Sequence, residues 1–171
     1  MDYSTESLIS KKEVKKNVLS FLVGDEEYSV DVTNVLEIIK IQEIFKIPQV
    51  PEFVAGIVNI RGKIITVFDL ALKFKIQNVA YNEDSKIIVL KEDNINIGFL
   101  VSKVIDCFAI DVNDIEPMLP VKTYVPKDCI VGIGKYEEKP ILILDFKTLH
   151  SLIVDEIKQH LLKRFRTEAR E

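Results

Sequence analysis

The sequence predicts a mainly β protein made of two similar halves, each folding into a small barrel. Apolar residues make up 47% of the chain, and β-branched Ile and Val dominate them, which favours strands over helices. Short apolar segments recur between turns that contain Gly or Pro, a pattern typical of small barrels. The same order of elements appears twice, about 70 residues apart. We therefore expect a duplicated β domain.

The first half follows a polar and charged segment, residues 1–16, which we expect to be a flexible tail. The chain then reads as a strand, a tight turn and an alternating strand, with Gly24 and Asp25 supplying the turn. The half closes with the apolar run 64–68, which is consistent with a strand buried on both faces. We place the first barrel half at residues 17–80.

The second half repeats this plan. Residues 86–90 and 95–101 are predicted strands on either side of a polar turn. The apolar run 141–144 then closes this half. We place the second barrel half at residues 81–147. Whether strands exchange between the two halves stays open at this point.

The C-terminal segment, residues 148–171, has a helical pattern. Apolar residues recur along it with the spacing of one helix face: Leu149, Leu152, Ile153, Ile157, Leu161, Leu162 and Phe165. We expect this helix to cover a barrel. Partner binding is the alternative role.

Charge and hydropathy argue against two classes of partner. The net charge is -4, and the densest basic run, near the C-terminus, is interleaved with Glu168. An acidic chain without a basic stripe is not expected to bind nucleic acid. Because no apolar stretch approaches the ~18 residues that span a bilayer and the N-terminus does not resemble a signal peptide, we expect a soluble, cytoplasmic protein without direct membrane insertion.

The sequence carries no motif that requires a metal, a cofactor or a catalytic triad. His150 and His160 lie too far apart for a zinc-binding helix, and Cys107 and Cys129 form no C-x-x-C pair. Residues 132–134 begin like a dinucleotide-binding fingerprint, but no third Gly follows. We therefore predict no enzyme, no cofactor and no metal site.

One enzymatic alternative remains, in which Arg61 and either Asp69 or Glu37 form a polar site on a small β-barrel. That hypothesis predicts a deep pocket lined by these groups, with strongly shifted carboxylate pKa values. The simpler interpretation of Arg61 is a salt bridge with a nearby carboxylate that fixes local shape. Direct contact with a protein partner is the other possibility.

The most specific segment of the chain is residues 48–70. It holds a proline pair, an aromatic residue and the pattern Gly-x-x-Asn-x-Arg-Gly at residues 56–62, followed by a strand that ends in Asp-Leu. This segment closely resembles CheW, a family of bacterial chemotaxis coupling proteins. The resemblance extends over residues 19–152, and the Asn-Ile-Arg-Gly block is its strongest part.

The resemblance implies two tandem five-stranded SH3-like β-barrels with a C-terminal α-helix. It also implies a chemotaxis adaptor that couples methyl-accepting chemoreceptors to the histidine kinase CheA on receptor arrays beneath the inner membrane. A CheW-like adaptor of a twitching or gliding array would have the same fold, so this alternative stays open.

The resemblance also assigns roles to residues. The cytoplasmic tip of the receptor, a helical hairpin, would lie in an apolar groove between the barrels. The matching groove positions here are Val35, Val104 and Cys107, bordered by Glu37 and Arg61.

The second partner would be the regulatory domain of CheA, which shares the double-barrel fold. The segment that matches the family's kinase-coupling region contains Gly56, Asn59, Arg61 and Gly62. We expect the missing side chain of Gly56 to permit close approach there.

Overall fold

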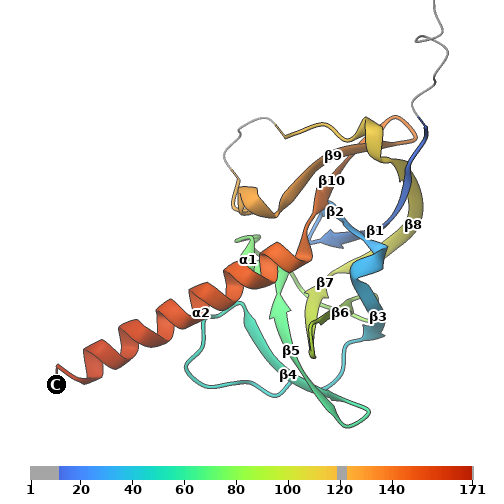
Figure 1. The fold of residues 1–171 in the computed structure, drawn as a ribbon. Helices are drawn as coiled ribbons and strands as arrows, with labels where there is room; N and C mark the ends of the chain where they lie inside the picture. The colour runs from blue at the N-terminus through green and yellow to red at the C-terminus, as the bar shows by residue number, and fades with distance from the viewer. Residues whose placement is uncertain (1–11, 119–122, 171) are drawn as a thin grey trace, which may run out of the picture.

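The computed structural model describes residues 12–118 and 123–170, which form two five-stranded SH3-like barrels and a long C-terminal helix, α2 (Phe146–Glu168) (Figure 1). One barrel, here named the terminal barrel, contains β1 (Lys15–Val23), β2 (Glu26–Asp31), β8 (Lys103–Asp111), β9 (Ile130–Tyr136) and β10 (Lys139–Leu144). The other, named the central barrel, contains β3 (Val35–Lys40), β4 (Val54–Ile60), β5 (Lys63–Asp69), β6 (Lys86–Glu92) and β7 (Ile95–Val101). The predicted fold class is confirmed.

Each barrel takes strands from both halves of the chain. The terminal barrel has the order β8-β1-β2-β10-β9, and the central barrel has the order β3-β6-β7-β5-β4. A boundary between residues 80 and 81 therefore does not separate the barrels. The central barrel runs without a break in sequence from β3 to β7, and the terminal barrel is assembled from the strands on both sides of it.

A short 3-10 helix, η1 (Val32–Asn34), sends the chain from the terminal barrel into the central barrel. The side chain of Asp31 caps η1 by accepting hydrogen bonds from the Thr33 amide at 2.9 Å and the Thr33 hydroxyl at 2.8 Å. β3 then pairs with β6 instead of folding back on β2. The first hairpin and the next five strands thus belong to different barrels.

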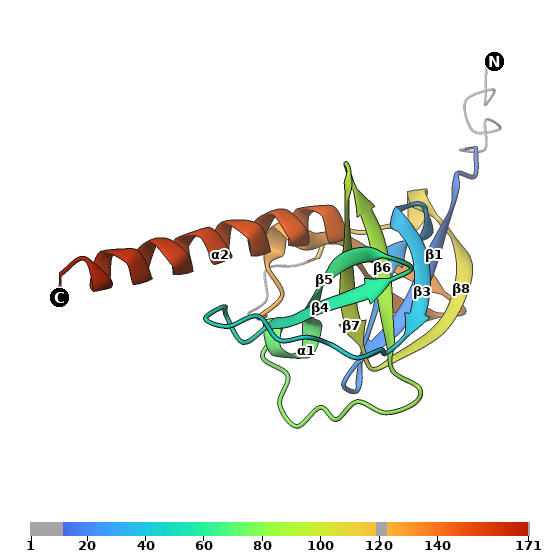
Figure 2. The same cartoon turned by 90° about the horizontal axis from the view of Figure 1, so that it is seen from below.

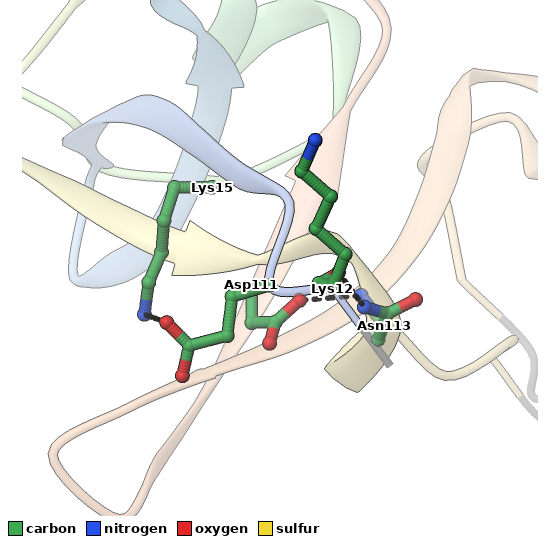
Figure 3. Close-up of polar contacts among 5 residues, drawn as sticks. Lys12, Lys15, Asp111 and Asn113 are labelled. Carbon is green, nitrogen blue, oxygen red and sulfur yellow. Dashed lines mark hydrogen bonds and ion pairs between the residues drawn. The ribbon is translucent and has the colours of Figure 1, made fainter. Parts of the chain in front are cut away.

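The segment predicted as a flexible tail overlaps β1. Residues 1–11 lie outside the described part of the chain, whereas Lys15 and Lys16 pair with Asp111 and Ile110 of β8. Figure 3 shows the polar contacts at this end, where the Asn113 side chain donates to the Lys12 carbonyl at 3.3 Å and the Asn113 amide donates to Asp111 at 2.9 Å.

The two halves end in matching helix caps. Asp69 follows β5 and caps the short helix α1 (Leu70–Lys73), and Asp145 follows β10 and caps α2. The Asp145 carboxylate accepts from the amides of Lys147 at 3.0 Å and Thr148 at 3.3 Å, a standard N-cap arrangement. This cap starts α2 at Phe146, two positions before the predicted start at residue 148.

The largest hydrophobic cluster lies between the barrels. It joins residues of β1 and β2, of β5 to β7, and of the first half of α2, and we call it the inter-barrel core. Phe146 of α2 is fully buried there, with ring centroids 4.6 Å from Phe99 and 5.6 Å from Phe21. Two smaller clusters fill the barrels themselves. The helix predicted to cover one barrel therefore seals the junction between two.

α2 has two different halves. Its buried residues, Phe146, Leu149 and Ile153, all lie in the N-terminal part of the helix. The rest of the helix extends away from the barrels, as Figures 1 and 2 show.

Replacing Phe146 with alanine should destabilise the fold strongly. The change leaves a cavity in the inter-barrel core, so we expect the free energy of unfolding to fall by about 3–5 kcal/mol in urea titration. Phe165→Ala is the matched control in the same helix, because the Phe165 side chain is 66% exposed; it should change stability by less than about 0.5 kcal/mol. Equal losses in the two variants would contradict a core centred on Phe146.

Candidate functional site

β3 and β8 occupy the same end position in their respective sheets and lie on the same side of the molecule (Figures 1 and 2). Both strands expose large aliphatic side chains: Leu36 is 50% exposed, Ile38 40% and Ile105 45%. The strand pairing shifts register at Leu36 of β3 and at Ile105 of β8, and such a bulge interrupts the regular alternation of faces. Leu36 and Ile105 are therefore exposed beside the half-buried Val35 and Val104, and Ile38 and the exposed Cys107 follow them two positions further on. This surface is apolar on both barrels.

The two valines expected to line a groove are only partly exposed. Val35 and Val104 are half-buried, and both pack against the inter-barrel core. They occupy matching positions on β3 and β8, so the structure brings them into one environment. The more exposed neighbours Leu36, Ile38 and Ile105 were missed by the sequence reasoning. Apolar residues on both faces of these two strands are the signal that could have found them.

Arg61 and Glu37 form the salt bridge that the sequence allowed. The Arg61 Nη2 atom donates to both carboxylate oxygens of Glu37, at 2.7 and 2.9 Å. This hydrogen bonding raises the pKa of Arg61. The Arg61 side chain is 75% exposed, and such a surface pair contributes little to stability. Its main effect is geometric, because it ties the β4–β5 turn to β3.

The rest of the Asn-Ile-Arg-Gly block builds that turn. The Asn59 side chain accepts a hydrogen bond from the Gly62 amide at 2.9 Å. Gly62 has φ +82° and Arg61 has φ +50°, so the chain passes through left-handed conformations at two consecutive residues. Glycine adopts such a conformation without steric cost. Asn59 and Gly62 hold the turn, and Arg61 stands exposed on it.

Gly56 permits a close approach, but the approaching group belongs to the same chain. Gly56 is buried with φ +144°, and a Cβ atom there would lie 2.2 Å from the carbonyl oxygen of Phe45. The Phe45 backbone pairs with Ile57 through two hydrogen bonds of 2.9 Å. Gly132 is the matching residue of β9, where a Cβ would lie 2.6 Å from the Glu116 oxygen. Both glycines allow a connecting segment to close its barrel.

Of the polar groups proposed for the enzymatic alternative, Arg61 and Glu37 meet in their ion pair, whereas Asp69 lies apart from them. A cavity of about 310 Å³ beside Arg61 is lined by Glu37 but also by the aliphatic side chains of Leu36 and Ile65. Asp69 lies at the other end of β5, where its carboxylate accepts a hydrogen bond of 2.5 Å from the hydroxyl of the half-buried Tyr81. Burial and this hydrogen bond raise the pKa of Tyr81.

No group of three or more His, Cys, Asp and Glu side chains in residues 12–118 and 123–170 is placed to hold a metal ion. Over the same ranges, no helix combines the length and apolar character needed to cross a membrane.

Two joined barrels with an exposed aliphatic surface on equivalent strands define a protein-interaction module. Similarity to known proteins identifies the family of this module. The CheW-like domain family model matches residues 17–153, and the chain belongs to this family. It is therefore a non-enzymatic scaffold protein of chemotaxis.

Individual relatives agree with this assignment. Chemotaxis protein CheW of Klebsiella aerogenes is 30% identical over 148 residues, covering 86% of this chain and 89% of that protein. Chemotaxis protein CheW of Helicobacter pylori is 31% identical over 138 residues, covering 79% and 83%. The crystal structure of the scaffolding protein TtCheW from Thermoanaerobacter tengcongensis has a TM-score of 0.71 and 34% identity, covering 85% of this chain and 90% of that one.

The two glycines of the segment should respond differently to alanine. Gly56→Ala forces a side chain onto the Phe45 carbonyl at an unfavourable φ, so we expect a loss of about 3 kcal/mol or more in unfolding free energy. At Gly62, a Cβ atom would have no described atom within 4 Å apart from the two neighbouring residues. Gly62→Ala therefore introduces only the cost of a left-handed alanine, about 1 kcal/mol. Thermal denaturation followed by circular dichroism would compare them. A Gly56→Ala variant as stable as Gly62→Ala would contradict the Phe45 contact.

Proposed function

We propose that this chain couples chemoreceptors to the histidine kinase CheA by binding both partners at once, without performing chemistry itself. The observation that carries the proposal is the pair of equivalent strands, β3 and β8, that present aliphatic side chains beside the ion pair of Arg61 and Glu37. Membership of the CheW-like family supplies the partner classes.

The receptor site in this proposal is the surface shared by the two barrels. A helical hairpin binds by laying an apolar face against an apolar groove. Val35 and Val104 would form the floor of the groove, Cys107 would lie on its β8 side, and Glu37 and Arg61 would border it. Leu36, Ile38 and Ile105 would supply the exposed apolar contacts that half-buried valines cannot supply alone.

The kinase site in this proposal is the β4–β5 turn and the strand that leads into it. Arg61 would make the direct contact, because it is the exposed charged group on the turn. Gly56, Asn59 and Gly62 would act indirectly, by fixing the shape of this segment. The regulatory domain of CheA would bind this end of the central barrel in the cytoplasm, within receptor arrays beneath the inner membrane.

The two proposed sites share residues, which suggests how coupling could work. Glu37 lies on β3 of the receptor surface, and Arg61 lies on the turn of the kinase segment. Because one ion pair links them, a change of geometry at one site alters the other. Receptor conformation would in this way reach the kinase through a single ion pair.

Aspartate at an exposed apolar position of the groove should weaken receptor binding without unfolding the protein. Leu36→Asp and Ile105→Asp place a charge where the receptor helix would bury it, so we expect at least about a tenfold loss of affinity for a receptor cytoplasmic fragment. Val131→Asp on β9 is the control, because Val131 is equally exposed but lies on another strand. Unchanged binding by the Leu36 and Ile105 variants, with native circular dichroism, would refute this placement of the site.

Exchanging the charges of the ion pair should separate its two possible roles. Arg61→Glu puts two carboxylates together and should weaken CheA binding in pull-down assays. If the pair acts only by holding the turn, Glu37→Arg combined with Arg61→Glu should restore binding. Because we assign Arg61 a direct contact, we expect the double variant to stay defective. Wild-type binding by both variants would exclude any role of the pair in coupling.

A further inference from the structure

The second half of α2 is not explained by the double-barrel fold. The match to the family model ends at residue 153, and Ile153 is also the last buried residue of the helix. Residues 154–168 continue as regular helix. Glu156 still pairs with Lys73 and Ile157 still packs against the inter-barrel core, and beyond them the helix extends away from the barrels (Figures 1 and 2). This extension lies outside the family-model match, so its own surface should indicate what it contacts.

Four exposed residues form a seam along this extension. Lys158, Leu161, Phe165 and Glu168 are separated by three, four and three positions, which is the spacing of the seam in a two-stranded coiled coil. Leu161 is 39% exposed and Phe165 66%. Leu162, 51% exposed, lies next to the seam and widens its apolar part. The extension therefore carries a short coiled-coil face that no part of the described chain covers.

We propose that this seam binds the same seam of a second copy of the chain, with the two helices antiparallel. In that arrangement Lys158 faces Glu168 of the second copy, and Leu161 faces its Phe165. The two-fold axis repeats both contacts, because in an isologous interface each contact between two different residues occurs twice. The order Lys, Leu, Phe, Glu thus gives an apolar centre with an attractive charge pair at each end.

Other occupants fit the seam less well. A parallel pair in register would place Lys158 against Lys158 and Glu168 against Glu168, and like charges in contact are destabilising. An anionic surface or an acidic partner would be attracted by Lys158 but repelled by Glu168. The neighbouring cation Arg164 donates to the Gln49 carbonyl at 3.5 Å, which ties its charge to the barrel side. A second copy is the partner that complements both charged ends.

The dimer should be weak. The seam covers about three turns of helix, so the buried area falls at the low end of protein interfaces. We expect a dissociation constant on the order of 10 to 100 µM. The chain would then be monomeric when dilute and dimeric where many copies are held close together.

Exchanging charges across the seam gives a specific test of the dimer. Self-association of the full chain is measured by sedimentation velocity over about 5 to 500 µM, a range that brackets the expected dissociation constant. Wild-type protein should shift from monomer to dimer. Lys158→Glu opposes two carboxylates, Glu168→Lys opposes two ammonium groups, and each variant alone should self-associate at least about tenfold more weakly. An equimolar mixture of these two variants should dimerise again, because each charge then faces its opposite.

Lys163→Glu is the matched control. Lys163 is exposed and lies about 160° around the helix from Phe165, so the same charge change there should leave the dimer intact. The four positions are exposed, and circular dichroism should show all variants folded. Wild-type protein that stays monomeric to the highest concentration, a mixture that fails to dimerise, or a Lys163→Glu variant as defective as Lys158→Glu would each overturn the proposal. None of these results bears on receptor or CheA binding.

Discussion

The packing of Phe146 between the two barrels is the interaction on which the rest of the structure depends. Its ring contacts Phe21 from the terminal barrel and Phe99 from the central barrel, so a single side chain of α2 joins both. The barrels contain only small cores of their own, and small cores provide little stability. Most of the burial therefore arises from the junction, and the junction also sets where β3 and β8 lie relative to one another. An apolar surface shared by both barrels exists only because this core holds them in one arrangement.

Local secondary structure was predictable from the sequence because it depends mainly on residues close together in the chain. The turn at Gly24 and Asp25, the apolar closing runs and the helical C-terminus all have patterns that identify them without tertiary information. The start of α2 was placed at residue 148 instead of Phe146 because the capping role of Asp145 was not considered. The exchange of strands could not be predicted, since the first hairpin has the same hydrophobic pattern whichever three strands it joins. Only the course of the chain after Asp31 decides between the two pairings.

The candidate site shows the same division between local and tertiary information. The Asn-Ile-Arg-Gly block was found by its pattern, and the structure explains most of that pattern as turn geometry, with Asn59 holding Gly62 and leaving Arg61 exposed. The ion pair with Glu37 could be proposed but not assigned, because it forms between a turn and a strand 24 positions apart. Leu36 and Ile105 were missed because their exposure follows from bulges in the pairing of β3 and β8, and a bulge depends on the partner strand, not on the local pattern.

The two halves of α2 connect the inner structure to the outer one. Residues Phe146 to Ile153 are fixed in the inter-barrel core, and the extension continues from them as one uninterrupted helix. A helix of 23 residues is about 35 Å long and bends little over that length. A second copy bound at Leu161 and Phe165 would therefore be held at a set distance and angle from both barrels. The same anchoring that positions the β3 and β8 surfaces within one molecule would then position them between molecules, so that two adaptors would present their partner sites as a fixed pair.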